Sequence, residues 1–330
     1  EHDINAQAYD ATKLIVTDET FQAAQPLWEE TTERVEARLI PAIDAGVTPI
    51  ITGFIGATQT GVTTTLGRGG SDYSAAIFAA LVDSDEFVVW TDVDGVMTTD
   101  PRVDKRARVL PYISYQEVGE LAFYGAKVLH PKTVQPILDK EIPIYVRNTF
   151  NPTFEGTLIH KEARASKTVI KAVTSVRNTS MLIVSGKGML GVPGIAGRTF
   201  LASARAGANI LMISQSSSEQ SFCFTVMDDR AQIVKHAVEN ELYEEIQRRN
   251  VDGVEILDEV VIVTVVGAGM RGTPGVAGRV FSTLGDNGVN VLAIAQGASE
   301  YSISFSVAEV DLEAAVTVLH ELALETVESL

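Results

Sequence analysis

The chain has 330 residues, of which 45% are hydrophobic and 21% charged, a composition typical of two or three globular domains. It excludes a wholly disordered, collagen-like or coiled-coil chain. The 43 acidic and 26 basic residues give a net charge of −17, which argues against nucleic acid or an anionic membrane as partner, because both bind basic surfaces. The single cysteine, Cys223, excludes an intrachain disulfide and favours a reducing, cytoplasmic compartment. The first residues lack the basic and apolar regions of a signal peptide.

Residues 1–160 alternate helical and strand patterns, which is typical of a parallel-rich α/β sheet. The expected helices cover residues 25–42, 73–81, 115–124 and 133–140, and the expected strands cover residues 49–52, 87–91 and 144–147. The pattern begins without a first strand and first βα turn. The charged residues 159–167 are predicted to form a linker.

A duplicated module occupies the second half of the chain. Residues 188–226 and 269–307 align without a gap at an offset of 81 (269 − 188 = 81), and 19 of the 39 aligned positions are identical. Each copy predicts the order β-α-β-β-α, and the first copy continues into a further strand that the second lacks. A spare alternating segment, residues 168–176, precedes the first copy. We therefore predict that it closes the second module's sheet and that the two modules interleave.

Three glycine motifs resemble nucleotide-binding loops without their full pattern. Residues 186–191 and 267–272 fit GxGxxG after a strand, but a Pro-Gly pair delays the helix, and the next strand ends in glutamine instead of the acidic residue that binds a ribose. Residues 56–63 have P-loop spacing, but Val62 stands where the lysine is required. These patterns argue against a dinucleotide site or a P-loop.

The run Gly67-Arg68-Gly69-Gly70-Ser71-Asp72 lies between an expected strand and an expected helix. Its glycines let the backbone approach a ligand, the helix N-terminus offers free N–H groups to an anion, and Arg68 adds a guanidinium fork for a carboxylate or phosphate. A glycine turn with Ser71 or Asp72 as the helix N-cap explains the same residues equally well.

A second polar run follows the buried strand 87–91, at the strand end where open α/β sheets bind ligands. Asp92 and Asp94 suit a ribose, an amine or a metal, and Arg102 suits a phosphate; an acidic turn is the alternative. A third run, Gly125-Ala126-Lys127-Val128-Leu129-His130-Pro131, places a lysine near a helix start. It suits a phosphate, and solvated lysines around a turn are the alternative.

With Ser114-Tyr115-Gln116-Glu117, these runs make the chain similar to aspartate kinases, members of the amino-acid kinase family that carry a pair of C-terminal ACT domains. The resemblance covers nearly the whole chain. It implies an α/β/α kinase sandwich, truncated at its start, over residues 1–160. Two interleaved ferredoxin-like (βαββαβ) ACT domains follow over residues 161–330, with repeat units at about 177–258 and 259–330.

The resemblance implies transfer of the ATP γ-phosphate to the β-carboxylate of L-aspartate with Mg²⁺, an early step toward lysine, threonine and methionine. Asp72 is the implied catalytic or organising carboxylate, and Met97 replaces a tyrosine that is frequent in the family. The implied aspartate contacts are Phe54, Arg68, Ser71 and Asp72. The implied ATP contacts are Thr91, Asp92, Met97, Arg102 and Lys127.

Aspartate kinases begin with a strand and a Lys-Phe-Gly-Gly loop that this sequence does not contain, so we expect a fragment. Loss of one transition-state donor commonly lowers a rate by about 10²–10³. The alternative is therefore that the chain as given is a non-catalytic module that binds an effector and dimerises. A weaker alternative is a kinase for another amino acid such as glutamate, against which the tandem modules and residues 90–96 argue.

The resemblance also implies an amino-acid effector and a homo-oligomer formed through the ACT domains. Residues 213–219 and 294–300 resemble the threonine-sensitive branch, which includes the kinase half of bifunctional aspartate kinase–homoserine dehydrogenases. Lysine-sensitive relatives often carry an acid in the strand at residues 209–212, where this chain has none, so we favour threonine over lysine. A glutamine amide can donate to and accept from such a ligand, although buried backbone is an alternative partner. The implied effector contacts are Gln215, Gln296, Asn209 and Asn290.

Overall fold

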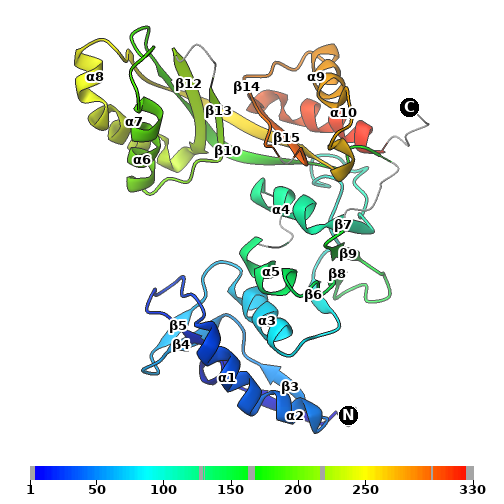
Figure 1. Cartoon of the computed structure of the whole chain (residues 1–330). Helices are drawn as coiled ribbons and strands as arrows, with labels where there is room; N and C mark the ends of the chain where they lie inside the picture. The colour runs from blue at the N-terminus through cyan, green and yellow to red at the C-terminus, as the bar shows by residue number, and fades with distance from the viewer. Residues whose placement is uncertain are drawn as a thin grey trace. The chain divides into compact units, whose positions relative to one another are not determined.

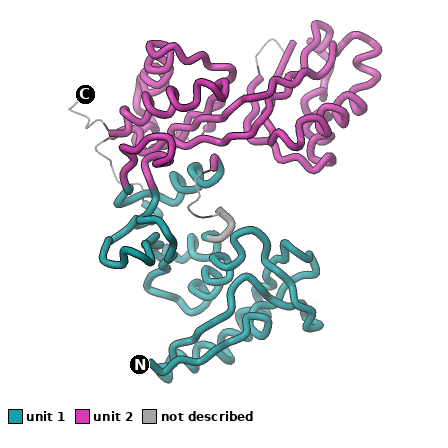
Figure 2. Tube along the Cα trace, turned by 180° about the vertical axis from the view of Figure 1, so that it is seen from behind, with its two compact units in different colours: residues 1–96, 109–123, 127–164 teal, residues 97–108, 124–126, 165–330 magenta. Residues whose placement is uncertain are grey.

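The computed structural model describes residues 4–125, 129, 131–162, 168–215, 220–298 and 300–324, without the side chains of residues 131–133. It divides into two compact units (Figure 2). The first unit comprises residues 1–96, 109–123 and 127–164, and the second comprises residues 97–108, 124–126 and 165–330. Within the described part of the chain, no helix combines the length and apolar character that crossing a membrane requires.

The first unit consists of small, mostly parallel sheets flanked by helices (Figure 1). β1 pairs with β3 and β2 with β4, both in parallel, and β5 adds to β4 antiparallel. A four-stranded sheet has the order β6-β8-β9-β7, in which β6 and β8 are parallel neighbours. The strands are β1 (Ala6–Tyr9), β2 (Val16–Thr17), β3 (Thr48–Ile51), β4 (Ile55–Thr58), β5 (Thr63–Thr65), β6 (Phe87–Thr91), β7 (Tyr112–Ser114), β8 (Ile144–Asn148) and β9 (Thr157–His160).

The helix predicted at residues 25–42 is two helices, α1 (Trp28–Arg38) and α2 (Ile40–Asp44). Pro41 stands in the first turn of α2, where its missing N–H costs nothing, but it cannot continue the hydrogen-bond ladder of α1. The remaining predicted helices of this unit match within three residues. They are α3 (Gly70–Leu81), α4 (Tyr115–Phe123) and α5 (Pro131–Leu138).

The run Ser114-Tyr115-Gln116-Glu117 is a capping box at the start of α4. The Ser114 N–H and hydroxyl both donate to Glu117 Oε2 at 2.8 Å, and the Glu117 N–H donates back to Ser114 Oγ at 3.3 Å. Glu117 is fully buried, so these bonds satisfy a carboxylate that would otherwise be costly. This part of the family resemblance therefore has a structural explanation.

The second unit is built on one six-stranded sheet with the order β11-β12-β10-β13-β15-β14. Its two long central strands are β10 (Ala172–Ser185) and β13 (Gly253–Val266), which run antiparallel. The outer strands are β11 (Met212–Gln215), β12 (Ser221–Met227), β14 (Ala293–Ala295) and β15 (Ser302–Ala308).

The two central strands exchange partners halfway along their length. At the start of β10, Ala172 pairs with Val266 of β13, and Val266 pairs in turn with β15. At the end of β10, Ser185 pairs with Gly253 of β13 on one side and with β12 on the other. Each half of the sheet thus has four strands, because β10 and β13 each contribute one part of their length to either half, and the interleaved fold is confirmed. Asn178 and Glu259 have positive φ values of 56° where the strands pass from one half to the other.

Helices cover each half of this sheet (Figure 1). α6 (Ile195–Arg205), α7 (Asp228–Glu241) and α8 (Tyr243–Gln247) belong to the first repeat. α9 (Val276–Asp286) and α10 (Leu312–Leu324) belong to the second. Each repeat encloses its own apolar core, around Phe224 in the first and Phe305 in the second.

In both GxGxxG runs, a glycine lets a second backbone segment pass close to it. A Cβ on Gly186 would overlap the carbonyl oxygen of Asn250, and a Cβ on Gly267 would overlap that of Val169. Asn250 and Val169 are themselves separated by one repeat (250 − 169 = 81). The glycines therefore allow close backbone packing, in agreement with the sequence argument against a dinucleotide site.

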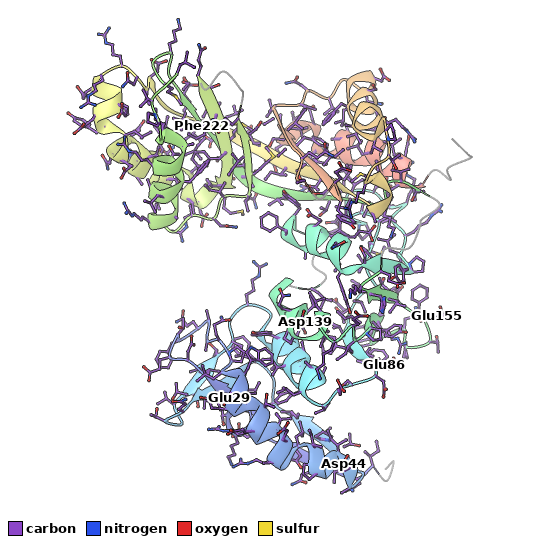
Figure 3. All side chains as sticks on the ribbon, viewed as in Figure 1. Glu29, Asp44, Glu86, Asp139, Glu155 and Phe222 are labelled. Carbon is purple, nitrogen blue, oxygen red and sulfur yellow. The ribbon has the colours of Figure 1, made fainter. Side chains whose placement is uncertain are left out.

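The acidic excess lies on the surface. Glu29, Asp44, Glu86, Asp139 and Glu155 come from five separate segments of the first unit, and all are exposed (Figure 3). Exposed carboxylates of this kind are the usual arrangement on a protein surface.

Candidate functional site

The glycine run before α3 forms a tight turn that begins the helix. Gly67 and Gly69 have φ values of 83° and 71°, which favour glycine, and the Gly70 N–H donates to the Gly67 carbonyl at 2.9 Å. A Cβ on Gly70 would lie 2.7 Å from the ring of Phe54. The turn thus requires glycine for its backbone and for its packing against Phe54.

Phe54 and Ser71, both predicted substrate contacts, are brought together at this helix start. The Phe54 N–H donates to Ser74 Oγ at 3.1 Å, and the Ser74 hydroxyl donates to the Ser71 carbonyl at 2.8 Å. Phe54 has a φ of 75°, a strained value for a non-glycine residue, and its side chain is 43% exposed. Strained residues with accessible side chains cluster at functional sites.

Arg68 and Asp72 complete the predicted substrate group. Arg68 lies in the exposed turn, and Asp72 is half-buried in the first turn of α3. Neither side chain has a hydrogen-bond partner among the described residues, so both are available to a ligand. Burial raises the pKa of the Asp72 carboxyl above its ordinary value. A basic fork and a carboxylate at a helix N-terminus can bind the carboxylate and ammonium groups of an amino acid.

A second polar group lies where β6 and β8 end side by side. The Asn148 and Asn151 amides donate to Asp94 Oδ1 at 2.8 and 3.2 Å, and the Thr91 hydroxyl donates to Asp92 Oδ1 at 3.2 Å. Thr91 and Asp92 are predicted ATP contacts, whereas the sequence analysis missed the two asparagines. In the sequence, only their position at or after the end of β8 points to these asparagines. That position is informative only when β8 is known to lie beside β6.

Gly95 fixes the path of the chain just after this group. Its φ is 148°, and a Cβ there would overlap the hydroxyl of Thr157. That hydroxyl accepts the Val96 N–H at 2.8 Å and donates to the Leu110 carbonyl at 2.7 Å. Buried hydrogen bonds therefore hold the turn after β6.

Three predicted ATP contacts remain. Met97 and Arg102 belong to the second unit, and Lys127 lies outside the described residues. The Arg102 fork binds the Asp100 carboxylate, with Nη2 2.6 Å from Oδ2, and keeps the pKa of Asp100 below its ordinary value. Arg102 is otherwise exposed, so a phosphate would have to share it with Asp100.

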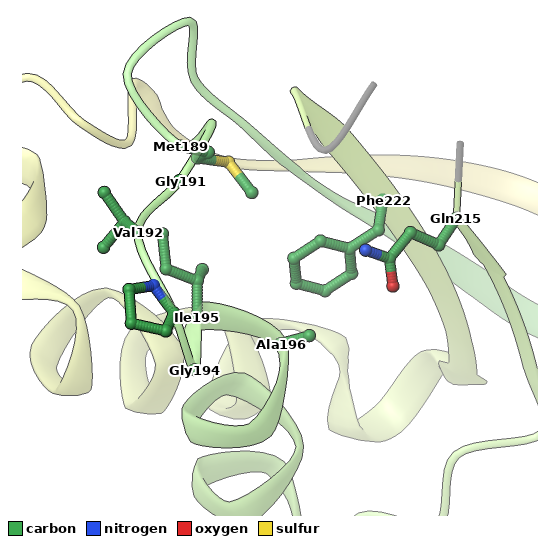
Figure 4. Close-up of a pocket in the computed structure, with 9 residues that line it drawn as sticks. Met189, Gly191, Val192, Gly194, Ile195, Ala196, Gln215 and Phe222 are labelled. Carbon is green, nitrogen blue, oxygen red and sulfur yellow. The ribbon is translucent and has the colours of Figure 1, made fainter. Parts of the chain in front are cut away.

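A pocket of about 270 Å³ lies in the first repeat, between the loop that begins α6 and the ends of β11 and β12 (Figure 4). Gln215 and Phe222 project toward this loop, so the pocket has an apolar wall and one amide (Figure 4). It is lined by Met189, Gly191, Val192, Pro193, Gly194, Ile195, Ala196, Gln215 and Phe222.

Of the four predicted effector contacts, Gln215 alone lines this pocket; Asn209, Asn290 and Gln296 are exposed on other loops. The side chains of Gln215 and Gln296 make no hydrogen bond to the residues that the structure describes. The alternative role of the glutamines is hydrogen bonding to buried backbone groups. This role therefore has no support among those residues.

Among the described residues, no three His, Cys, Asp or Glu side chains converge as a metal site. Mg²⁺ that accompanies a nucleotide needs only one or two protein carboxylates besides phosphate oxygens. Asp92 fits that need, because the paired amides of Asn148 and Asn151 occupy Asp94 instead.

The chain matches two known protein families. Residues 1–148 match the amino acid kinase family, and residues 182–242 and 263–322 each match the ACT domain. Among curated proteins, the chain is 41% identical over 293 residues to a bifunctional aspartokinase/homoserine dehydrogenase of Haemophilus influenzae, covering 89% of the chain and 36% of that relative. It is 35% identical over 334 residues to the chloroplastic aspartokinase 1 of Arabidopsis thaliana, covering 98% and 57%. The chain thus spans about a third of the bifunctional relative's length.

Two solved structures share the fold. Aspartokinase III of Escherichia coli, in complex with aspartate and ADP, superposes with a TM-score of 0.78 at 32% identity, over 98% of this chain and 71% of that one. The aspartate kinase of Clostridium acetobutylicum superposes with a TM-score of 0.83 at 28% identity, over 95% and 70%. The kinase-type fold, the tandem ACT modules and these similarities show that the chain belongs to the aspartokinase family.

Proposed function

We propose that the protein carrying this chain transfers the γ-phosphate of ATP to the β-carboxylate of L-aspartate. The observation that carries the proposal is the start of α3 in a chain of the aspartokinase family: the Phe54 ring lies against Gly70, and Arg68, Ser71 and Asp72 belong to the turn and first helical turn there. The E. coli relative with this fold was solved with aspartate and ADP.

The proposed roles follow from charge. Arg68 and the helix N-terminus would bind a carboxylate of aspartate, Asp72 would orient its ammonium group, and Phe54 would exclude water from one side. The attacking carboxylate is ionised at neutral pH and needs no general base, so catalysis depends on positioning and on neutralising the phosphates.

The nucleotide would meet Thr91 and Asp92 at the end of β6. Mg²⁺, when bound with ATP, supplies charge neutralisation at the phosphates, and Asp92 is the available carboxylate for it. Met97, Arg102 and Lys127 remain proposed contacts on the family resemblance alone.

Trapping of aspartyl phosphate with hydroxylamine tests the proposal. The protein should form the hydroxamate with ATP, Mg²⁺ and aspartate, and should not form it when glutamate replaces aspartate. Absence of hydroxamate from the full-length protein would contradict the proposal.

The alternative is that the 330-residue chain itself only binds an effector and self-associates. The exposed Gln215 amide at a preformed pocket favours binding of this kind whatever the activity of the first unit. Hydroxamate formation by the 330-residue chain would exclude the alternative.

We also propose threonine as the effector, with Gln215 as a contact in the first repeat and Gln296, Asn209 and Asn290 as further contacts. A neutral hydroxyl amino acid suits an amide in a pocket whose lining, as far as the structure describes it, includes no carboxylate. Because the E. coli enzyme was also solved with lysine, lysine is the competitor to test.

The homo-oligomer is proposed to form through β11 and β14, edge strands whose Ile213 and Ile294 are 43% and 46% exposed. A cytoplasmic location remains a prediction from the single cysteine.

A further inference from the structure

The segment of residues 97–108 follows β6 and precedes β7 in the sequence, yet it belongs to the second unit. Three attachments hold it there. The Val173 N–H of β10 donates to the Thr98 carbonyl at 2.8 Å, Val103 packs against the core of the second repeat, and Asp104 reaches His320 of α10. We call residues 97–108 the connecting segment.

His320 is fully buried, and both of its ring nitrogens bond to the connecting segment. Nδ1 lies 2.8 Å from Asp104 Oδ2, and Nε2 lies 2.8 Å from Thr98 Oγ1. The imidazole therefore joins two points of the segment that are six residues apart.

The donors and acceptors of this network are complementary. Arg106 holds the pKa of Asp104 far below its ordinary value, so the carboxylate is an acceptor and Nδ1 must carry the proton. Nε2 faces the Thr98 hydroxyl at 2.8 Å, and the oxygen of that hydroxyl also accepts the Arg108 N–H at 3.0 Å. Every polar atom named here has a partner, so a substitution of His320 leaves buried groups unsatisfied.

Arg106 extends the attachment along α10. Its guanidinium binds Asp104 at 2.8 Å, Glu321 at 3.0 Å and the Thr317 carbonyl at 3.3 Å. The connecting segment is thus fixed on one helix by a buried imidazole and a half-exposed arginine. Its Arg102 side chain remains exposed.

We propose that His320 is a positioning residue for ATP: it fixes on α10 the segment that carries Met97 and Arg102. The inference rests on the proposed function, in which these two residues contact the nucleotide. His320 touches no substrate itself and acts through Thr98 and Asp104, so its loss should weaken binding of ATP rather than of aspartate.

Steady-state kinetics of the full-length protein test this, with ATP and aspartate varied separately in the hydroxamate assay. We expect His320→Ala to raise the KM for ATP about tenfold and to leave the KM for aspartate within about twofold. His320→Asn keeps a donor near Nδ1 for Asp104 and should raise the KM for ATP about threefold or less. His236→Ala, on the exposed face of α7 in the first repeat, is the matched control and should change neither constant.

Hydrogen exchange of the same proteins supplies a readout independent of activity. His320→Ala should speed exchange in residues 97–108 but not in β11 and β12. Faster exchange in residues 97–108 with an unchanged KM for ATP would overturn this inference and leave the proposed function standing. An equal rise in the KM values for ATP and aspartate, or exchange in residues 97–108 that stays slow, would do the same. If His320→Ala does not fold, the kinetics and exchange of His320→Asn decide by the same criteria. A wild-type protein without hydroxamate formation would overturn the proposed function and this inference with it.

Discussion

Asp72 combines a proposed chemical role with a cost to the folded state. Burial raises its pKa, which means that the folded protein holds the Asp72 proton more tightly than the unfolded chain does. The free energy of unfolding therefore falls as the pH rises from the ordinary value of 3.8 through the raised one, and the cost persists at neutral pH. Such a cost is common where a charge serves function.

Asp72→Asn separates these two effects. We expect kcat to fall by about 10²–10³, because the charge that orients substrate is lost. The free energy of unfolding at pH 7 should stay the same or rise, because no charge is buried. The hydroxamate assay and urea unfolding measure the two, with Asp44→Asn at the exposed end of α2 as control. A variant with unchanged kcat would contradict the role of Asp72.

The elements of the second unit depend on glycines that allow close packing. Gly267 has no room for a Cβ beside the Val169 carbonyl, whereas a Cβ on Gly278 within α9 would have nothing within 4 Å of it. The two glycines belong to one repeat and differ only in their surroundings.

Gly267→Ala should lower the free energy of unfolding by about 2 kcal/mol or more, because backbone must move to admit the methyl group. Gly278→Ala should raise it by about 0.5–1 kcal/mol, because alanine has the higher helix propensity. Urea unfolding of both variants checks the difference in sign. Equal destabilisation by the two substitutions would show that the close approach at Gly267 is unimportant.

The attachment of residues 97–108 to α10 predicts a pH dependence. Since the folded-state pKa of Asp104 lies far below 3.8, its contribution to stability is complete above that value and is lost as the pH falls below it. Asp104→Asn should be less stable at pH 7 and should lose less stability between about pH 4 and 2. Chemical unfolding across this range checks both; a variant with an unchanged acid limb would contradict the assignment.

Most of the second unit was predictable because the repeat shows itself in the sequence at one constant offset. The strand predicted at residues 168–176 continues in β10 to Ser185, and this continuation was not predicted because it depends on pairing with the distant strand β13. β1, β2, β4, β7 and β9 were missed, because strands this short leave little local pattern.

The candidate site was predictable where one local run carries the chemistry, as at Arg68 to Asp72. It was not predictable where the partner is distant in sequence. The asparagines on Asp94 and the imidazole on Thr98 and Asp104 lie 54 to 222 residues away from the atoms they bind. Such contacts depend on which elements become neighbours, and no local periodicity encodes that choice.

At the scale of the whole molecule, the proposed effector acts on a pocket that lies in one repeat. Threonine at about 100 times its Kd should raise the free energy of unfolding of the second unit by about 2.7 kcal/mol, and lysine should not. Gln215→Ala should abolish the increase, and Gln232→Ala, exposed on α7, should retain it. Calorimetry with both ligands checks this; stabilisation by lysine alone would replace threonine as the effector.

The measurement that matters most is hydroxylamine trapping of aspartyl phosphate by the full-length protein with ATP, Mg²⁺ and aspartate. We predict hydroxamate that requires ATP and aspartate, is not formed from glutamate and decreases when threonine is added. ATP turnover without hydroxamate, or no turnover in a folded sample, would contradict the assignment of aspartate as the phosphate acceptor.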